Sequence, residues 1–287
     1  MNASSILSVL LMASVTLSGC TAPQPPVSAS GTGARPVVLQ GAMDVEVQQL
    51  ASRLDGVRVE KVGGWTFWRG TIDGYPVVVS KTMKGVANAA AATTIAAEHY
   101  HPAAIINQGT AGGHEPALHL YDIVIGTYAV NIGAFKTADR ADGKGSDFLE
   151  WTPMDLMASD GSAAADPRAH TMRRFQGSPQ LMAAAVSVKS RYRQGQVVQG
   201  VIGSSEMWNN ELDRVNWLHR EYGTSVEEME TASAAQIAGL FDIPFLGIRV
   251  VSDNITNGGA YDRKTGEACQ AYVYDVARAF VGTLSKP

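Results

Sequence analysis

The sequence predicts an α/β fold built around a mainly parallel sheet, and three observations support this. From Pro36 onward, short apolar stretches alternate with helix-like stretches along the rest of the chain, the order expected when helices cover a sheet. The 287 residues, 45% of them apolar, are enough for a sizeable core. Finally, polar motifs directly follow several of the predicted strands.

Each element follows from its local sequence. Short apolar runs between turn residues predict strands, Ala-rich or periodic stretches predict helices, and Asp73-Gly74 between two apolar runs predicts a hairpin turn. In chain order these are a strand at 37–40, a helix at 44–54, a hairpin of 65–70 and 75–80, a helix at 84–100, strands at 103–107 and 122–130, a helix at 179–193, a strand at 196–202, a helix at 231–240, a strand at 244–251 and a helix at about 266–284. The polar, Gly/Asp-rich residues 136–178 predict a long loop.

Charge and composition exclude several classes of function. The formal net charge of -4 argues against nucleic acid or an anionic membrane surface as the main partner. The six histidines are scattered and there are only two cysteines, so no zinc-like spacing is present. We therefore expect neither a metal site nor a nucleic-acid interface.

The N-terminus predicts export. Residues 6–17 form an uncharged apolar run, too short to span a bilayer but suited to the core of a signal peptide. The following "LSGC" resembles the lipobox of bacterial lipoproteins, in which the cysteine, here Cys20, carries the lipid. We expect a signal peptide at 1–20, a Pro/Ser/Gly-rich tether at 21–35 and one domain at 36–287, lipid-anchored on the periplasmic or cell-surface side. The alternative is an ordinary signal peptide with an incidental cysteine.

Five polar motifs are expected at one edge of the sheet. In parallel α/β sheets, ligands bind at the carboxyl ends of strands, where the helices begin. Each motif alone is weak evidence, because polar strand-to-helix turns are common, but five together favour a ligand site. The motifs are "GAMDVE" (41–46), "NQGTAGG" (107–113), "GSSEMWNN" (203–210), "SVEEMETASA" (225–234) and "VVSDN" (250–254).

The carboxylates in these motifs also have structural interpretations. Glu46 and Glu230 stand at helix starts, where an anion interacts favourably with the helix dipole, and Asp253 could serve as a helix N-cap. For Met207 and Trp208 the structural interpretation is core packing, although two asparagines beside the indole favour the edge of a ligand cleft.

Together the motifs resemble those of the purine nucleoside phosphorylase/nucleosidase superfamily. "GAMDVEV", "NQGTAGG", "EEMETASAAQIA" and "PFLGIRVVSDN", in this order and spacing, are most similar to those of 5′-methylthioadenosine/S-adenosylhomocysteine nucleosidases. The resemblance runs from about Pro36 to the C-terminus and matches poorly at 136–178. It implies a three-layer α/β/α sandwich around a mixed, mainly parallel sheet, usually in a homodimer. It also implies hydrolysis of the N-glycosidic bond of adenine nucleosides without a metal or organic cofactor.

The resemblance implies a role for each matching position. Catalytic roles fall on Asp253, which would protonate the purine at N7, on Glu46, which would activate the attacking water, and on Arg249, which would help to orient that water. The other matching positions imply substrate binding: Glu230 and Met229 at the ribose, Thr110 beside the ribose and the water, Met207 and Trp208 around the base, and Glu228 near the sugar or bonded to backbone amides. A protonated acid suits this reaction, because charge builds on the departing base as the ribosyl centre becomes cationic, and it requires a raised pKa at Asp253.

Two other functions remain open. A phosphorylase of the same superfamily would need a phosphate pocket; Arg140, Arg168, Arg173 and Arg174 could supply one, whereas Asp44 and Glu46 in the first motif would repel phosphate. An exported nucleoside-binding or storage protein is the other alternative, and the intact set of Glu46, Glu230 and Asp253 argues against it. The base and the 5′ substituent of the nucleoside are left open by the sequence.

Overall fold

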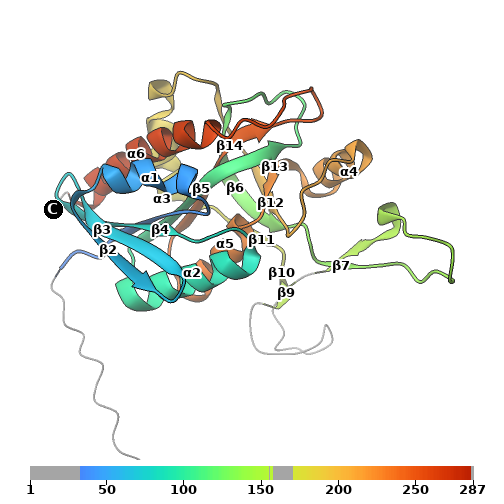
Figure 1. Ribbon diagram of the computed structural model, residues 1–287, viewed down its shortest axis with the longest axis horizontal. Coiled ribbons are helices and arrows are strands. Elements are labelled where there is room, and N and C mark those ends of the chain that lie inside the picture. Colours follow the sequence, from blue (N-terminus) through green and yellow to red (C-terminus); the bar gives the residue numbers. More distant parts are fainter. Residues whose placement is uncertain (1–32, 155, 158–170, 286–287) are drawn as a thin grey trace, which may run out of the picture. The chain divides into compact units, whose positions relative to one another are not determined.

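A mixed sheet of ten strands forms the centre of the described structure (Figure 1). The structure is a computed structural model, and it describes residues 33–154, 156–157 and 171–285. The predicted signal peptide, Cys20 and nearly all of the predicted tether therefore lie outside the described residues. From Ala34 onward the chain forms one unit.

The strands and helices have the following bounds. The strands of the main sheet are β1 (Val37–Gly41), β2 (Asp55–Val62), β3 (Trp65–Ile72), β4 (Tyr75–Lys81), β5 (Ala104–Gly113), β6 (Ile123–Asn131), β11 (Arg174–Gln176), β12 (Val197–Ser204), β13 (Thr224–Glu228) and β14 (Phe245–Asp253). Two short pairs lie apart from it: β7 (Phe135–Lys136) with β8 (Thr152–Pro153), and β9 (Leu156–Met157) with β10 (Thr171–Met172). The helices are α1 (Asp44–Ser52), α2 (Val86–Tyr100), α3 (Pro179–Ser187), α4 (Leu212–Tyr222), α5 (Thr231–Leu240) and α6 (Thr265–Leu284).

Five strands of the main sheet close into a ring. Strand β14 pairs with both β5 and β6, and the path β6-β12-β13-β5 joins those two strands on the other side. Parallel pairings join β1 to β4 and β5, β12 to β6 and β13, and β14 to β5, while the remaining pairings are antiparallel. The predicted α/β class and mixed sheet are therefore confirmed, and the ring brings the ends of β5, β12, β13 and β14 together.

Helices cover both faces of the sheet, as Figure 1 shows. Helices α1, α3 and α6 lie over one face, where Leu50, Leu181 and Val273 share a core with strand residues such as Leu39 and Ile106. Helices α2 and α5 lie over the other face, in a core that is rich in alanine. Because alanine is small, these two helices pack close to the strands that carry the polar motifs.

Several element boundaries differ from the sequence-based expectation. The 103–107 strand continues to Gly113, so "NQGTAGG" lies within β5 and not in a turn after it. Helix 179–193 ends at Ser187, and a short 3₁₀ turn follows. The 136–178 region is not one long loop, because the described part contains short strands and a 3₁₀ turn. Strands β2 and β13 and helix α4 were not predicted.

An arginine inside an aromatic cluster attaches part of the 136–178 region to α4. The guanidinium carbon of Arg214 lies 4.8 Å from the ring centre of Phe135, 5.4 Å from that of Phe148 and 5.3 Å from that of Trp151. The ring of Trp217, one turn along α4, lies 5.1 Å away. These cation–π contacts of the buried Arg214 hold the segment around Phe148 and Trp151 against helix α4. In the described part of the chain, no helix is both long enough and apolar enough to cross a membrane.

Close packing of α5 on β14 predicts opposite effects for two glycine substitutions. A Cβ at Gly247 would lie 2.5 Å from Thr231 Cγ2 and 3.0 Å from Ile202 Cδ1, so Gly247→Ala overpacks the contact. It should lower the free energy of unfolding by about 1–3 kcal/mol in urea titrations. Gly239, within α5, has nothing within 4 Å of such a Cβ, and Gly239→Ala should raise that free energy by about 0.5–1 kcal/mol. Equal effects of the two substitutions would contradict this packing.

Candidate active site

A cavity of about 180 Å³ lies at the edge of the sheet where the polar motifs meet. Of the predicted site residues in the described part of the chain, all except Arg249 line it: Glu46, Thr110, Met207, Trp208, Glu228, Met229, Glu230 and Asp253. The wall also includes Lys84, Glu227, Ser252 and Tyr261, which were not predicted. The convergence expected from the sequence is therefore present in the structure.

Glu46 is buried and accepts four hydrogen bonds. Its Oε2 accepts from the backbone N–H of Ala42 (2.9 Å) and Met43 (3.0 Å), and its Oε1 accepts from the N–H (2.8 Å) and hydroxyl (3.0 Å) of Thr110. The side chain thus folds back over the start of its own helix, α1, and also reaches β5. Gly109 makes this possible, because a Cβ there would lie 2.7 Å from Glu46 Oε1. The structural and functional interpretations of Glu46 are therefore compatible.

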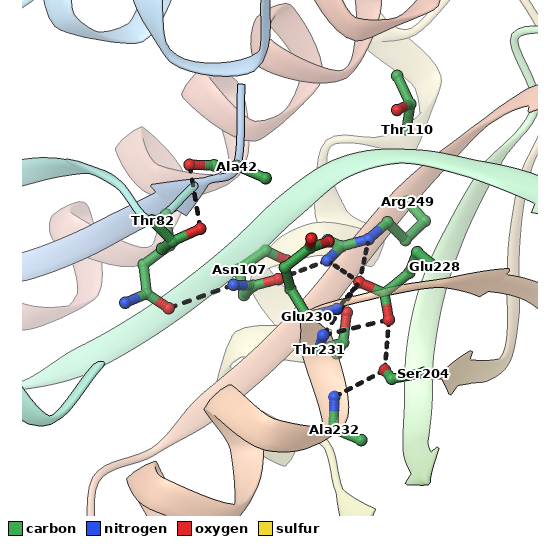
Figure 2. Close-up of polar contacts among 12 residues, drawn as sticks. Ala42, Thr82, Asn107, Thr110, Ser204, Glu228, Glu230, Thr231, Ala232 and Arg249 are labelled. Atoms are coloured by element: carbon green, nitrogen blue, oxygen red, sulfur yellow. Dashed lines mark hydrogen bonds and ion pairs between the residues drawn. The ribbon is translucent and has the colours of Figure 1, made fainter. Parts of the chain in front are cut away.

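Arg249 is buried, does not line the cavity and pairs with Glu228 (Figure 2). Its Nη2 is 2.5 Å from Glu228 Oε2, and the same guanidinium donates to the backbone and side-chain oxygens of Asn107. Glu228 also accepts hydrogen bonds from the Ser204 hydroxyl and from the N–H of Thr231. The Arg249 guanidinium therefore bonds to Glu228 and Asn107, and Glu228 bonds to Arg249, Ser204 and backbone amides, which is one of the two roles expected for it.

The charges around Glu228 determine its protonation. Burial alone would raise the pKa of this carboxyl, but the positive charge of Arg249 and the hydrogen bonds from Ser204, Arg249 and Thr231 outweigh it, and the pKa is lowered. Glu228 is therefore an anion that its buried counterion neutralises.

Glu230 faces the cavity from the start of α5. Its Oε1 accepts a hydrogen bond from the N–H of Gly85 (2.8 Å) at the start of α2. Burial raises its pKa to about 8, and the negative charges of Glu228 and Glu46 act in the same direction, while Arg249 and the Gly85 N–H act against it. Glu230 thus differs from Glu228, which is bonded to Arg249 and has a lowered pKa.

Asp253 is the last residue of β14 and lines the cavity. The Ser252 hydroxyl donates a 2.9 Å hydrogen bond to Asp253 Oδ1. Burial raises the pKa of Asp253; the Ser252 hydrogen bond and His114 lower it, and the charge of Glu227 raises it further. The net shift is upward, which is the direction that a general acid requires.

Two exposed side chains form the rim. Met207 and Trp208 are 43% and 61% exposed, so neither belongs to the core, and the core-packing interpretation is wrong for both. The Trp208 ring packs against Tyr261, with 5.6 Å between ring centres. An exposed aromatic pair beside a cavity is typical of a site that stacks a flat ligand.

Positive charge is scarce at the cavity. Among the described residues that line it, Lys84 is the one Lys or Arg. Arg140 instead binds Glu150, and Arg174 donates to the carbonyl of Tyr222. Arg173 lies over the Tyr222 ring, and Arg168 is outside the described residues. Where the structure describes them, the candidate arginines for a phosphate clamp thus have other partners. No cluster of three metal-ligating side chains occurs in the described part of the chain.

Four buried polar residues at the site were not predicted: His114, Ser204, Asn209 and Glu227. Each makes its hydrogen bonds to residues far away in the sequence, so local pattern could not identify them. The sequence offered one signal, the pair Glu227-Glu228. Two adjacent charged residues break the apolar–polar alternation of a strand, and in a buried strand both need partners.

Comparison with known proteins gives a consistent result. The family model of the Phosphorylase superfamily matches residues 36–284. A 5′-methylthioadenosine/S-adenosylhomocysteine nucleosidase from Anoxybacillus flavithermus is 31% identical over 76% of this chain and 84% of its own length. A protein of the same name from Bacillus cytotoxicus is 30% identical over 76% of this chain and 85% of its own.

Solved structures share the fold. A crystal structure of a 5′-methylthioadenosine/S-adenosylhomocysteine nucleosidase from Colwellia psychrerythraea, in complex with adenine, has a TM-score of 0.65 and 24% identity, covering 86% of this chain and 96% of that one. Futalosine hydrolase of Helicobacter pylori has a TM-score of 0.67 and 18% identity, covering 87% and 98%. Because the family model spans the whole folded unit from β1 to α6 and the curated relatives match most of it, the chain belongs to the phosphorylase superfamily.

Proposed function

We propose that this protein hydrolyses the N-glycosidic bond of adenine nucleosides of the 5′-methylthioadenosine or S-adenosylhomocysteine type, releasing adenine and the sugar. The observation that carries the proposal is the grouping of Glu46, Glu230 and Asp253 in one cavity, in a chain whose curated relatives are nucleosidases. These carboxyl groups come from α1, the start of α5 and the end of β14, so they face a ligand from different sides.

Asp253 acts at the base. Its raised pKa favours the protonated form, and this proton passes to N7 of the purine as the bond between N9 and C1′ breaks. Met207 and Trp208 cover the flat faces of the base at the cavity rim. Protonation makes the base a neutral leaving group, and the ribosyl centre is left as a cation.

Glu46 and Thr110 act at the water. The Thr110 hydroxyl donates to Glu46, so its oxygen is free to accept a hydrogen bond from a water beside the sugar. When the water oxygen bonds to C1′, its proton passes by way of this hydroxyl to the Glu46 carboxylate. Glu230 holds the ribose hydroxyls above Met229, and Arg249 acts indirectly by orienting Glu228 behind them.

Phosphorolysis is the second candidate, and the charges at the cavity argue against it. A phosphate ion would meet the Glu46 carboxylate with only Lys84 to offset it among the described lining residues, and like charges at close range repel strongly. A non-catalytic nucleoside-binding role is also less consistent with the upward pKa shift of Asp253, which simple binding does not need.

We also propose that the protein is exported, lipid-anchored through Cys20 and homodimeric. The apolar run at 6–17 and "LSGC" support the anchor. The exposed apolar side chains Leu149, Met154 and Leu212 support a surface that a second copy covers, such as a dimer interface. An exported enzyme of this kind would act on nucleosides from the surroundings of the cell.

Product analysis in the presence and absence of phosphate tests the proposed reaction. Purified protein with 5′-methylthioadenosine in phosphate-free buffer should release adenine and the free sugar, at a rate that added phosphate does not raise. Chromatography of both products measures this outcome. Activity that requires phosphate and yields the sugar 1-phosphate would establish the phosphorylase instead, and absence of any product would favour the binding protein.

Asp253→Asn tests the general acid. The amide keeps the size of the side chain but has no proton to donate to N7, so kcat for adenine release should fall at least about 100-fold. Asp242→Asn is the matched control, because Asp242 is exposed in the turn after α5 and has a φ of 53°, which asparagine tolerates. Full activity of Asp253→Asn would remove Asp253 from the mechanism.

Cys20→Ala tests the anchor and the assembly together. In a bacterial host the wild-type protein should partition with the membrane fraction, whereas the variant should move to the soluble fraction with its activity retained. Sedimentation of the soluble variant should give twice the mass of one chain. Equal partitioning of the two proteins would refute the anchor, and a monomer mass would refute the dimer.

A further inference from the structure

Glu227 is a buried carboxylate at the cavity that the proposed mechanism does not use. It is 6% exposed, and its two oxygens have partners on two sides. Oε1 accepts a 2.8 Å hydrogen bond from the N–H of Asn209, and Oε2 accepts one of 2.5 Å from Asn209 Nδ2. On the other side, His114 Nε2 lies 3.2 Å from Oε2. Glu227 thus stands between an asparagine and a histidine, both of them buried.

His114 is itself held in place. Its Nδ1 lies 2.7 Å from the Thr224 hydroxyl, and its backbone N–H donates to the carbonyl of Ser225 (2.9 Å). Both contacts fix the residue after β5 to β13, the strand that carries Glu227. The imidazole is therefore oriented toward the carboxylate by its surroundings.

Glu227 and Asp253 lie on either side of one glycine. In the ring of strands, Gly112 of β5 pairs with Glu227 of β13 and with Asp253 of β14. A Cβ at Gly112 would lie 3.3 Å from Asp253 Oδ2 and 3.7 Å from Glu227 Cγ. Because glycine has no side chain there, the two acidic side chains approach each other over the same backbone position.

Asn209 connects Glu227 to the rim. It is a buried residue within segment 205–211, whose residues Met207 and Trp208 are exposed at the cavity. Backbone hydrogen bonds hold its ends, from the Ser205 N–H to the Glu228 carbonyl (3.0 Å) and from the Val215 N–H to the Glu211 carbonyl (2.9 Å). Between them, the Glu206 carboxylate accepts a 2.8 Å hydrogen bond from the N–H of Val86. Because that contact is exposed, the two buried bonds from Asn209 to Glu227 are the stronger attachment of the middle of the segment.

We propose that Glu227 is a positioning residue for the reaction at Asp253. Through Asn209 it holds segment 205–211 over the base, and across Gly112 its side chain lies beside the acid. The inference rests on the proposed function, since it concerns the protonation of a purine by Asp253.

The charged and polar groups around Asp253 determine how its pKa changes when one of them is substituted. Ser252 is its hydrogen-bonding neighbour, Glu227 raises its pKa and His114 lowers it. Tyr261 faces it from the loop after β14, and the other charged side chains lining the cavity are Glu46, Lys84, Glu228 and Glu230. Because Asp253 acts when protonated, activity is lost as the pH rises through its pKa. Loss of the Glu227 charge should move this alkaline limb down, and loss of His114 should move it up.

Opposite shifts in two variants form the test. Glu227→Gln should move the alkaline limb of kcat/KM for adenine release to lower pH by about 0.5–1 unit. His114→Gln replaces the imidazole beside Glu227 with a neutral amide, and should move the limb to higher pH. A purely structural role would lower activity at every pH without opposite shifts. Thermal unfolding of each variant shows whether it is folded, and if Glu227→Gln is not, Glu227→Asp should keep the limb while raising KM.

Adjacent asparagines test the attachment of the segment. Asn209→Ala removes the side-chain donor to Glu227 and should raise KM about tenfold with little change in kcat, as expected for loss of a hydrogen bond to a charged group. Asn210 is exposed, and Asn210→Ala should stay within about twofold of wild type on both constants.

The outcomes separate this inference from the proposed function. Wild-type protein that releases no adenine contradicts the proposed function. Wild-type activity with the same alkaline limb in folded Glu227 and His114 variants, or with both limbs moved in one direction, overturns the role of Glu227 and leaves the proposed function standing.

Discussion

The buried pair of Arg249 and Glu228 is the interaction on which the rest of the site depends. Arg249 belongs to β14 and Glu228 to β13, and their remaining hydrogen bonds reach Asn107 on β5 and Ser204 on β12 (Figure 2). Removing two charges from water is unfavourable unless every polar atom finds a partner, and here the guanidinium and the carboxylate are both fully engaged. Ser204 in turn accepts from the N–H of Ala232, so the same network fixes the start of α5. The network thereby links β5, β12, β13 and β14 to the first turn of α5.

This network explains why the pKa values of Glu228 and Glu230 are shifted in opposite directions. Glu228 has the counterion and is an anion, whereas Glu230, two residues along, faces the cavity without one and has a pKa near 8. Glu46 is stabilised by the start of α1 and by Thr110. The cavity therefore combines buried carboxyl groups with little positive charge of its own. Such an environment favours a ligand that becomes cationic during the reaction, because the developing charge relieves the unfavourable interactions among the acids.

The sequence was informative where chemistry and local pattern coincide. The α5 helix and the β3–β4 hairpin follow from small-residue and Asp-Gly signals, and Glu46, Glu230 and Asp253 stand at the element ends where the motifs predict them. Strand β13 was missed because its buried glutamates break the expected alternation and find their partners across the ring. Arg249 likewise belongs to a predicted motif, but its side chain turns toward Glu228 and does not line the cavity. A motif places a residue near the site without specifying the direction of its side chain. Long-range pairing, as between Glu227 and His114, has no signature in one sequence.

The closed ring of five strands has a consequence for how the molecule moves. A strand in a closed ring has hydrogen-bonded neighbours on both sides, so separating any of β5, β6, β12, β13 or β14 breaks two ladders at once. Amides in the ring should therefore exchange with solvent only in large, cooperative openings, while segment 205–211 and the loop that carries Tyr261 open locally at much lower free energy. The cavity rim is formed by side chains of these loops, Met207, Trp208 and Tyr261, and not by the strands of the ring.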